Sequence, residues 1–429
     1  MSSASRNADG SVLSPAVQRF LNDRVLLVAI FMAVALPWPV VFAFRAHIFA
    51  ASTFSSEVGQ VASSVAQGRG FSSPVGVPTG PTAWFTPVYP LLLAAILKIF
   101  GFYTASAAIA VRGLNIVFHG ALCMAAYWAA LPVLGRSTAR LGAFLTALYP
   151  QAIYTAATLM WDTSFLTAAL MLVIGVALRM EIEADSRTVV ACGLAMGITL
   201  LIDPAPLPFF MFLIVWRCWQ EWARPCAARN MALLILIPCA LFGPWMVRNY
   251  FATGVFTPRC CIGVELMVYN VDGASHPSLS SQEQQLYKTL GEKEYNSVSL
   301  QKAEKAIRND PGKYAARVLL RIRDWWFGGN PKEYRSDLHG LPDLNILAHL
   351  LVAGALLFAI FGAYQGIRQG AKIIPLIALL LIYPVPYYLI NVTDRYALPM
   401  RVIALLLTAH GLVTALRQAG AKQSPAIHN

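Results

Sequence analysis

Ten apolar runs recur along the chain, separated by short polar stretches. Runs of about 17 to 25 apolar residues are long enough to cross the hydrocarbon core of a bilayer as helices. The predicted spans cover approximately residues 25–44, 104–134, 141–157, 163–180, 188–203, 205–222, 230–247, 345–366, 373–390 and 397–416. The pattern therefore predicts an all-α, polytopic integral membrane protein with about ten transmembrane helices.

The basic residues of the short loops predict how these helices are oriented. Lys and Arg are enriched in cytoplasmic loops, and every second loop of this chain is basic. Both termini are therefore predicted to be cytoplasmic. The predicted regions are a cytoplasmic N-terminus (1–24), a transmembrane core (25–247) whose first outer loop is 45–103, an extracytoplasmic helical segment (248–343), C-terminal transmembrane helices (344–416) and a cytoplasmic tail (417–429).

The first outer loop contains a short apolar piece, Val88–Phe100. Apolar pieces of about 10 to 14 residues are typical of re-entrant or interfacial helices. Counting this piece as a span would also place the later arginine-rich loops outside. We therefore expect it to lie along the outer membrane surface.

The second interruption is the polar region from Arg248 to Asp343, where local chemistry predicts helices. Ser280 and Glu283 match a capping box, and Asp310-Pro311 matches an N-cap followed by a first helical residue. The helix that starts there ends at Trp325-Trp326, a pair that suits a membrane interface. The region is expected to form a small helical extracytoplasmic subdomain.

Composition agrees with a membrane protein and excludes other classes. The 429-residue chain is 57% hydrophobic and only 13% charged, with a mean hydropathy of +0.57. Its net charge of +12 comes from small basic groups between apolar runs, so no nucleic-acid partner is predicted. The seven cysteines follow neither a disulfide framework nor a zinc pattern.

Only two carboxylates, Glu57 and Asp162, lie between Asp23 and Glu181, and the predicted topology places both on the outer side. Ionisable groups at the edge of a bilayer are costly and mark functional sites. Each has a structural alternative. Glu57 could cap the start of a loop helix, and Asp162 could be the N-cap of the span that follows it.

Three polar residues share one face of the second predicted span: Arg112, Asn115 and His119. A polar stripe in an apolar helix faces protein or a water-filled cavity. Arg112 lies near the outer end, where it could bind a phosphate or a carboxylate, and the alternative is snorkelling to the interface. His119 lies deeper and is interpreted as a packed residue. Asp203 is interpreted as the N-cap of the next predicted span, and Pro204 as the first residue of that helix.

Several short motifs resemble one family in their order and in their common outer side. They are Ser55–Gln60 around Glu57, Gly68–Phe71, Gly80–Trp84, Pro87–Pro90, Trp161–Thr163, Pro244–Tyr250 and Asp394–Tyr396. The chain resembles integral membrane glycosyltransferases of the GT-C superfamily, which include the protein mannosyltransferases, the lipid A aminoarabinose transferase and the family 39-like bacterial proteins. It departs from them in one respect, because many members carry Asp or Asp-Glu where this chain has the single Glu57.

The resemblance implies a polyprenyl-phosphate sugar donor, an extracytoplasmic acceptor that is a lipid, a glycan or a protein, and inversion at the anomeric carbon. In that reaction Glu57 would be the base. Asp162 would orient the acceptor, pair with an arginine, or complete a divalent-cation site with Glu57, for which magnesium or manganese is the expected metal. No cofactor is otherwise predicted.

Arginines near span ends are the candidates for the leaving phosphate, because the planar guanidinium can hold two oxygens. Arg112 is the first candidate, Arg395 with Tyr396 is the strongest one after it by family position, and Arg248 and Arg69 follow. Trp84 and Tyr89 could stack on the sugar or line the lipid groove, and the alternative for both is the interfacial aromatic belt.

The predicted protein is therefore a glycosyltransferase of the cell (inner) membrane whose active site faces the periplasm or exterior. A transporter or flippase of a lipid-linked saccharide is the first alternative. It would show inverted repeats and a site at mid-membrane. A catalytically silent scaffold of the same fold is the second alternative.

Overall fold

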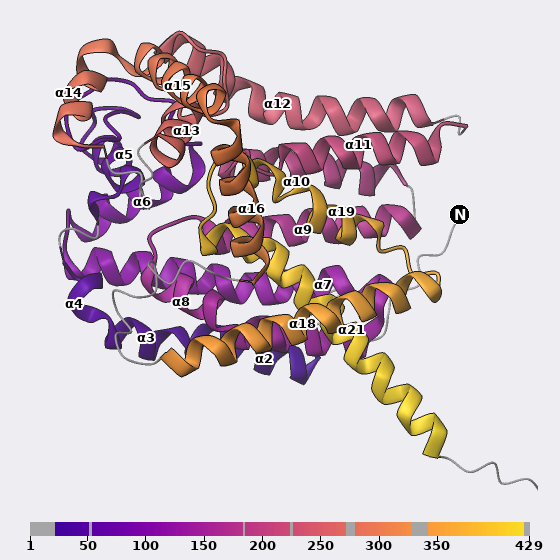
Figure 1. The fold of residues 1–429 in the computed structure, drawn as a ribbon. Helices are drawn as coiled ribbons and strands as arrows, with labels where there is room; N and C mark the ends of the chain where they lie inside the picture. The colour runs from indigo at the N-terminus through magenta and orange to yellow at the C-terminus, as the bar shows by residue number, and fades with distance from the viewer. Residues whose placement is uncertain are drawn as a thin grey trace, which may run out of the picture.

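The structure, a computed structural model, describes residues 22–50, 54–182, 185–223, 226–271, 279–327 and 342–423. These residues form helices and connecting loops, and no β-strand occurs among them. Most of the long helices run side by side as a bundle, and a group of shorter helices covers one end of it (Figure 1). The all-α polytopic fold predicted from the apolar runs is confirmed.

The bundle contains a helix or helix pair for every predicted span. In chain order its members are α2 (Arg24–Ala35) with α3 (Pro37–Ala43), α7 (Ala105–Leu148), α8 (Pro150–Thr158), α9 (Thr163–Ile182), α10 (Ser186–Ile202), α11 (Leu207–Glu221), α12 (Ala227–Thr253), α18 (Pro342–Arg368), α19 (Ile374–Ile382) with α20 (Val385–Leu389), and α21 (Leu398–Gln423). Among the described residues, five helical stretches are long and apolar enough to cross a membrane. The protein is therefore a multi-pass membrane protein, and its number of crossings stays a prediction.

Helix α7 covers parts of two predicted spans and is interrupted between them. Its backbone is non-helical at Gly135, where φ is 80° and ψ is 166°. Positive φ at this value is accessible to glycine without the steric penalty that a Cβ atom brings. The break therefore falls in the segment that the sequence assigned to the loop between the second and third spans.

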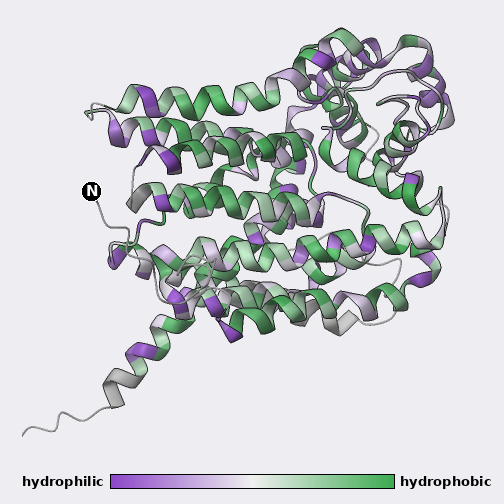
Figure 2. Ribbon diagram, turned by 180° about the vertical axis from the view of Figure 1, so that it is seen from behind, coloured by the Kyte–Doolittle hydropathy of each residue, from purple (hydrophilic) through white to green (hydrophobic). Residues whose placement is uncertain are grey.

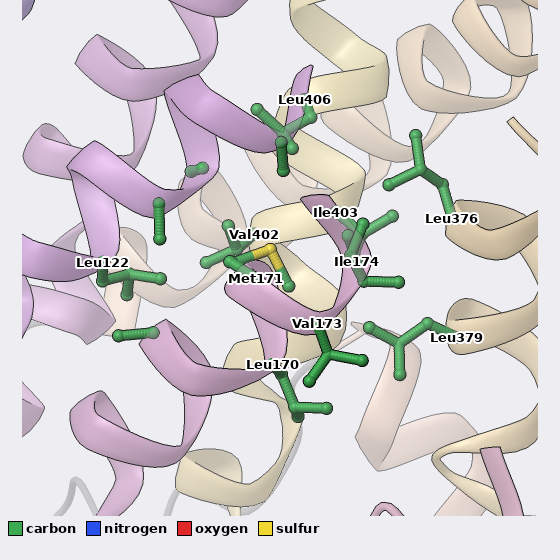
Figure 3. Packing of buried hydrophobic residues seen from close by; sticks show 14 of the residues in the cluster. Leu122, Leu170, Met171, Val173, Ile174, Leu376, Leu379, Val402, Ile403 and Leu406 are labelled. Atoms are coloured by element: carbon green, nitrogen blue, oxygen red, sulfur yellow. The ribbon is translucent and has the colours of Figure 1, made fainter. Parts of the chain in front are cut away.

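Helix α9 lies at the centre of the bundle core. Leu170, Val173 and Ile174 are buried on it, and they pack beside Leu376 and Leu379 of α19 and residues of α21 (Figure 3). Small residues let the helices approach closely. A Cβ atom added at Gly175 would lie 2.3 Å from the ring of Trp128 on α7. Close packing between apolar helices is the main attraction available inside a bilayer.

The shorter helices gather at one end of the bundle (Figure 1). They are α4 (Arg45–Ile48), α5 (Glu57–Ala66), α6 (Val88–Phe100), α13 (Ile262–Asn270), α14 (Ser281–Leu290) and α15 (Glu292–Asn309), and α16 (Pro311–Phe327) leads back to the bundle. Hydrophilic residues concentrate here and at the opposite helix ends, while the lengths of the bundle helices are apolar (Figure 2).

Local signals in the sequence set the ends of these shorter helices. The Ser280–Glu283 capping box is present at the start of α14. Asp310 accepts a hydrogen bond from the backbone N–H of Lys313 at 2.9 Å, so α16 begins at Pro311 as expected. Helix α6 has the bounds of the short apolar piece. The described residues between α12 and α18 are therefore largely helical, and the division of the chain into domains stays a prediction.

Candidate active site

Helix α5 positions Glu57 at its first turn. Ser56 is the N-cap, and its hydroxyl accepts from the backbone N–H of Gly59 at 3.4 Å. Glu57 is therefore the first residue inside the helix, and the cap that the sequence could have assigned to it belongs to Ser56. Gly59 permits a close approach, because a Cβ atom there would lie 2.8 Å from the methyl group of Met160. The start of α5 is thus packed against the turn that carries Asp162.

Asp162 lies in the turn between α8 and α9. Its backbone carbonyl accepts from the N–H of Leu166 at 2.7 Å, so the residue occupies the N-cap position of α9. The preceding Trp161 packs with Phe85 of the first outer loop, at 6.1 Å between ring centroids. The capping interpretation of Asp162 is thus compatible with its position, and it does not exclude a second role for the side chain.

Arg395 approaches the same turn from the end of the chain. It lies in η2 (Asp394–Ala397), directly before α21. Its guanidinium carbon is 4.0 Å from the centroid of the Trp161 ring, and Nη2 donates to the Tyr396 hydroxyl at 3.1 Å. Stacking on an aromatic face fixes the plane of a guanidinium and leaves its edge available for oxygen ligands.

Arg259 is a second cation of this site, from the loop that follows α12. Its Nη1 pairs with Asp203 Oδ2 at 3.0 Å, and Nη2 lies 3.9 Å from Glu265 Oε1. Its Nε donates to the backbone carbonyl of Trp84 at 3.0 Å. One arginine therefore joins the end of α10, the start of α13 and the first outer loop.

The electrostatics of Glu57 show which charges surround it. Burial raises the pKa of the Glu57 carboxyl, and the charge of Glu265 adds to this rise. The charges of Arg395 and Arg259 act in the opposite direction and lower the pKa. A carboxyl that is partly desolvated and held near two cations can serve as a base close to neutral pH.

The charges of the same two arginines act on the pKa of Asp162. Burial, and after it the charge of Asp203, raise the pKa of the Asp162 carboxyl to about 7. Arg259 and Arg395 lower it. Glu57 and Asp162, which are 105 positions apart in the sequence, therefore lie within the field of one pair of guanidinium groups.

A buried carboxylate on α15 holds the first outer loop in place. Glu292 Oε1 accepts from the backbone N–H of Ala83 at 2.7 Å, and Oε2 accepts from the Tyr287 hydroxyl at 2.6 Å and from the Thr82 hydroxyl. Burial raises the pKa of Glu292, against the effect of these hydrogen bonds and of Arg248. We refer to Thr82, Ala83, Tyr287 and Glu292 as the loop clamp.

Arg248, at the end of α12, also binds this loop. Its Nη1 donates to the carbonyl of Thr82 at 2.5 Å, and Nη2 donates to that of Phe71 at 3.0 Å. Trp84, in the same segment, is buried against Tyr287 at 5.6 Å between ring centroids. Arg69 is exposed in a turn between Gly68 and Gly70. These three predicted residues lie on or against the first loop.

Arg112 and Tyr89 form a separate buried group. Arg112 is only 2% exposed, and its Nε and Nη1 have no hydrogen-bond partner within the part of the chain that the structure describes. The Tyr89 hydroxyl donates to Asn115 Oδ1 at 3.1 Å, and Asn115 Nδ2 donates to the Leu159 carbonyl at 2.8 Å. His119, on the same face of α7, is fully buried.

The described residues contain no group of three or more His, Cys, Asp or Glu side chains arranged to hold a metal ion. Within those residues, the carboxylates that could contribute oxygen ligands near the two arginines are Glu57, Asp162, Asp203 and Glu265. Magnesium and manganese accept such ligands. A divalent cation between Glu57 and Asp162 therefore stays a prediction.

Four residues of this arrangement were not predicted from the sequence: Asp203, Arg259, Glu265 and Glu292. The interpretation of Asp203 as an N-cap was wrong. The N-cap of α11 is Pro206, whereas Asp203 ends α10 and accepts from the N–H of Ala205 at 2.7 Å. Asp203 could have been identified by the signal that identified Asp162, an isolated acidic residue in a predicted outer loop.

Comparison with solved structures identifies the fold. The archaeal oligosaccharyltransferase of Archaeoglobus fulgidus, tethered to an acceptor peptide, superposes with a TM-score of 0.54 at 15% identity over 97% of this chain and 52% of that chain. The archaeal oligosaccharyltransferase AglB of the same organism, in complex with an inhibitory peptide and a dolichol-phosphate, gives a TM-score of 0.51 at 14% identity, over 96% of this chain and 53% of that chain. This chain has the GT-C fold.

The GT-C assignment concerns the fold, because the sequence identities are low. The chain spans about half the length of the oligosaccharyltransferase structures that it matches. ArnT of Cupriavidus metallidurans bound to undecaprenyl phosphate gives a TM-score of 0.39 at 12% identity, over 96% of this chain and 80% of that chain. No family model matches the chain, and no curated protein matches it.

Proposed function

We propose that this GT-C protein is a glycosyltransferase that moves a sugar from a polyprenyl-phosphate donor to an extracytoplasmic acceptor, with inversion at the anomeric carbon. The observation that carries the proposal is the position of two carboxylates, Glu57 and Asp162, beside one pair of arginines, Arg259 and Arg395. A dolichol-phosphate is bound in one structure of AglB, which has the same fold.

In the proposed reaction the acceptor hydroxyl attacks the anomeric carbon as the bond from that carbon to the phosphate oxygen breaks. Glu57 takes the hydroxyl proton, and polyprenyl phosphate leaves with the negative charge. Asp162 orients the acceptor. A positioned base of this kind contributes about 10²- to 10⁴-fold to the rate.

Arg395 is the proposed ligand of the leaving phosphate. Its plane is fixed over Trp161, the residue before Asp162, so its charge lies beside the reacting groups. Tyr396, which accepts a hydrogen bond from Arg395, supports it. Arg112, with two buried donors that lack described partners, is proposed as a second phosphate ligand.

The other predicted residues receive different roles in this proposal. Arg259 is already held by Asp203, so we assign it to organising the carboxylates. Arg248 donates to two carbonyls of the first loop, which favours a supporting role for that loop. Trp84 and Tyr89 are buried within protein contacts, and we assign them to the wall of the sugar or lipid groove. Arg69 is exposed, and we assign it to contact with lipid headgroups.

The direct test uses purified protein in liposomes with radiolabelled polyprenyl-phosphate sugars and the lipid, glycan and protein fractions of the cell envelope. Covalent appearance of label in one fraction is the expected result. Movement of intact donor across the bilayer without covalent transfer would instead establish a flippase. Donor binding without turnover or movement would establish a silent scaffold. Either of these outcomes would overturn the proposed transfer.

The pH dependence of transfer follows from Asp162, whose pKa is raised to about 7. Below this pH the carboxyl is protonated and loses its negative charge, so it holds the acceptor hydroxyl more weakly. We therefore expect kcat/KM to rise with pH through about 7, and Asp162→Asn to lose this rise in its residual activity. The measurement is a pH–rate profile of both proteins. An unchanged acidic limb in Asp162→Asn would assign the limb to another group.

A further inference from the structure

Helix α16 has two faces of unusual polarity. The face turned towards the rest of the protein carries Tyr314, Arg317, Arg321 and Trp325, spaced three or four residues apart. Trp325 is fully buried and stacks on Tyr387 at 5.2 Å between ring centroids. A helix that faces water places its arginines outward and its apolar residues inward. On α16 two of the arginines point inward.

Backbone carbonyls explain why these arginines are stable there. Arg317 Nη1 donates to the carbonyl of Asn270, at the end of α13. Arg321 Nη1 donates to the carbonyl of Leu389 at 3.1 Å, at the end of α20, and the Tyr314 hydroxyl donates to the same oxygen at 3.0 Å. The last carbonyls of a helix lack intrahelical partners, and cations near them are favoured. The contacts fix α16 between α13 and α20.

The opposite face of α16 is exposed and, apart from Arg323, apolar. Leu319 is 67% exposed, and Leu320 and Phe327 are each 48% exposed. Ala315 and Ala316 continue this face, and Lys313 lies at its edge. Arg323 lies within the face, one turn from Leu319 and from Phe327, and pairs with Asp324 at 2.6 Å. We refer to Ala315, Ala316, Leu319, Leu320 and Phe327 as the outer face of α16. Its inward arginines already have protein partners, so the leucines are the side chains left for an external partner.

The orientation of α16 indicates what that partner is. Helix α16 crosses the direction of the long apolar helices instead of running along it (Figure 1). It also contacts α18 and α20, which belong to the bundle. Its 17 residues carry five charged side chains, too many for a span. A helix with this composition and direction lies in the plane of a membrane.

We propose that α16 is an interfacial helix whose outer face lies among the acyl chains of the leaflet on the side of α13–α15, with Lys313 and Arg323 at the phosphate headgroups. The occupant is the lipid surface itself. Helix α16 contacts α18 and α20 of the apolar bundle, so its outer face lies next to the part of the protein that crosses the membrane. The proposal does not depend on glycosyl transfer.

Carbene labelling of the wild-type protein tests this surface. Liposomes that contain a phospholipid with a diazirine in its acyl chain are irradiated, and the adducts are mapped by mass spectrometry. We expect adducts on the segment with Leu319 and Leu320 to exceed those on the exposed α15 residues near Glu304 by at least tenfold. In a double variant, Leu319→Glu with Leu320→Glu, we expect labelling of the segment to fall at least fivefold.

Two results would overturn the proposal, and both use the same samples with a water-soluble diazirine added. If the outer face of α16 is labelled by the water-soluble reagent as strongly as α15 and not by the lipid, the face is aqueous. If neither reagent labels it, another protein or a second copy of this chain covers it. Comparing the thermal unfolding of the double variant with wild type excludes loss of fold as the cause of lower labelling.

Discussion

Replacing Glu57 by Gln is expected to lower the rate of sugar transfer about 10²- to 10⁴-fold, the usual contribution of a positioned general base. Gln preserves the size of the side chain and its place at the first position of α5, but it cannot accept the acceptor proton. The change should appear in kcat with little change in donor affinity, because Arg395 and not Glu57 is the proposed phosphate ligand. Single-turnover transfer and donor binding measure the two quantities separately.

The control for this experiment must separate catalysis from helix stability. A negative side chain in the first turn of a helix stabilises it by about 0.3–1 kcal/mol, so Glu57→Gln should shift thermal unfolding only slightly. Glu304→Gln, the same change at a half-exposed carboxylate of α15, should transfer sugar like wild type. If Glu57→Gln transfers sugar as fast as wild type, Glu57 is not the base.

The loop clamp gives the largest expected effect on stability. In Glu292→Ala the backbone N–H of Ala83 and the hydroxyls of Thr82 and Tyr287 lose their acceptor in a buried place. Each buried donor left without a partner costs about 1–3 kcal/mol. We therefore expect a loss of about 3 kcal/mol or more in the free energy of unfolding, measured by denaturation of the purified protein in detergent.

Two further variants show whether the buried hydrogen bonds cause this loss. Glu292→Gln keeps an oxygen for the N–H of Ala83, and both hydroxyls can turn to meet its amide, so most of the stability should return. Glu294→Ala removes an exposed acid from the same first turn of α15 and should have little effect. Equal losses in Glu292→Ala and Glu294→Ala would refute the clamp and leave only a helix-terminus effect.

The fold could be predicted from the sequence because its signals are local and long. Apolar runs determine the bundle helices, and caps such as Ser280 and Asp310 determine where α14 and α16 begin. Glu57 and Asp162 could also be identified as candidates, because an isolated carboxylate in an apolar stretch is visible in the sequence alone. Their catalytic roles stay predictions.

The partners of these carboxylates could not be predicted because they come from distant segments. Arg259 meets Asp203 across 56 positions, and Glu292 meets Thr82 across 210. Glu292 does not stand out in the sequence, because it begins a helix that carries many other charges. Asp203 was misinterpreted because a following proline suggested a cap, whereas the tertiary ion pair with Arg259 decides its role.

The position of Arg395 in the sequence, after both carboxylates, determines when the candidate site can be complete during synthesis. Arg395 and its neighbour Tyr396 directly precede α21, and Tyr396 stacks on Tyr387, which stacks on Trp325 of α16. Both carboxylates precede Arg395 in the sequence, so a ribosome has translated them before this guanidinium exists. A nascent or prematurely terminated chain carries Glu57 and Asp162 into the membrane without Arg395, so the site is completed only when α21 inserts.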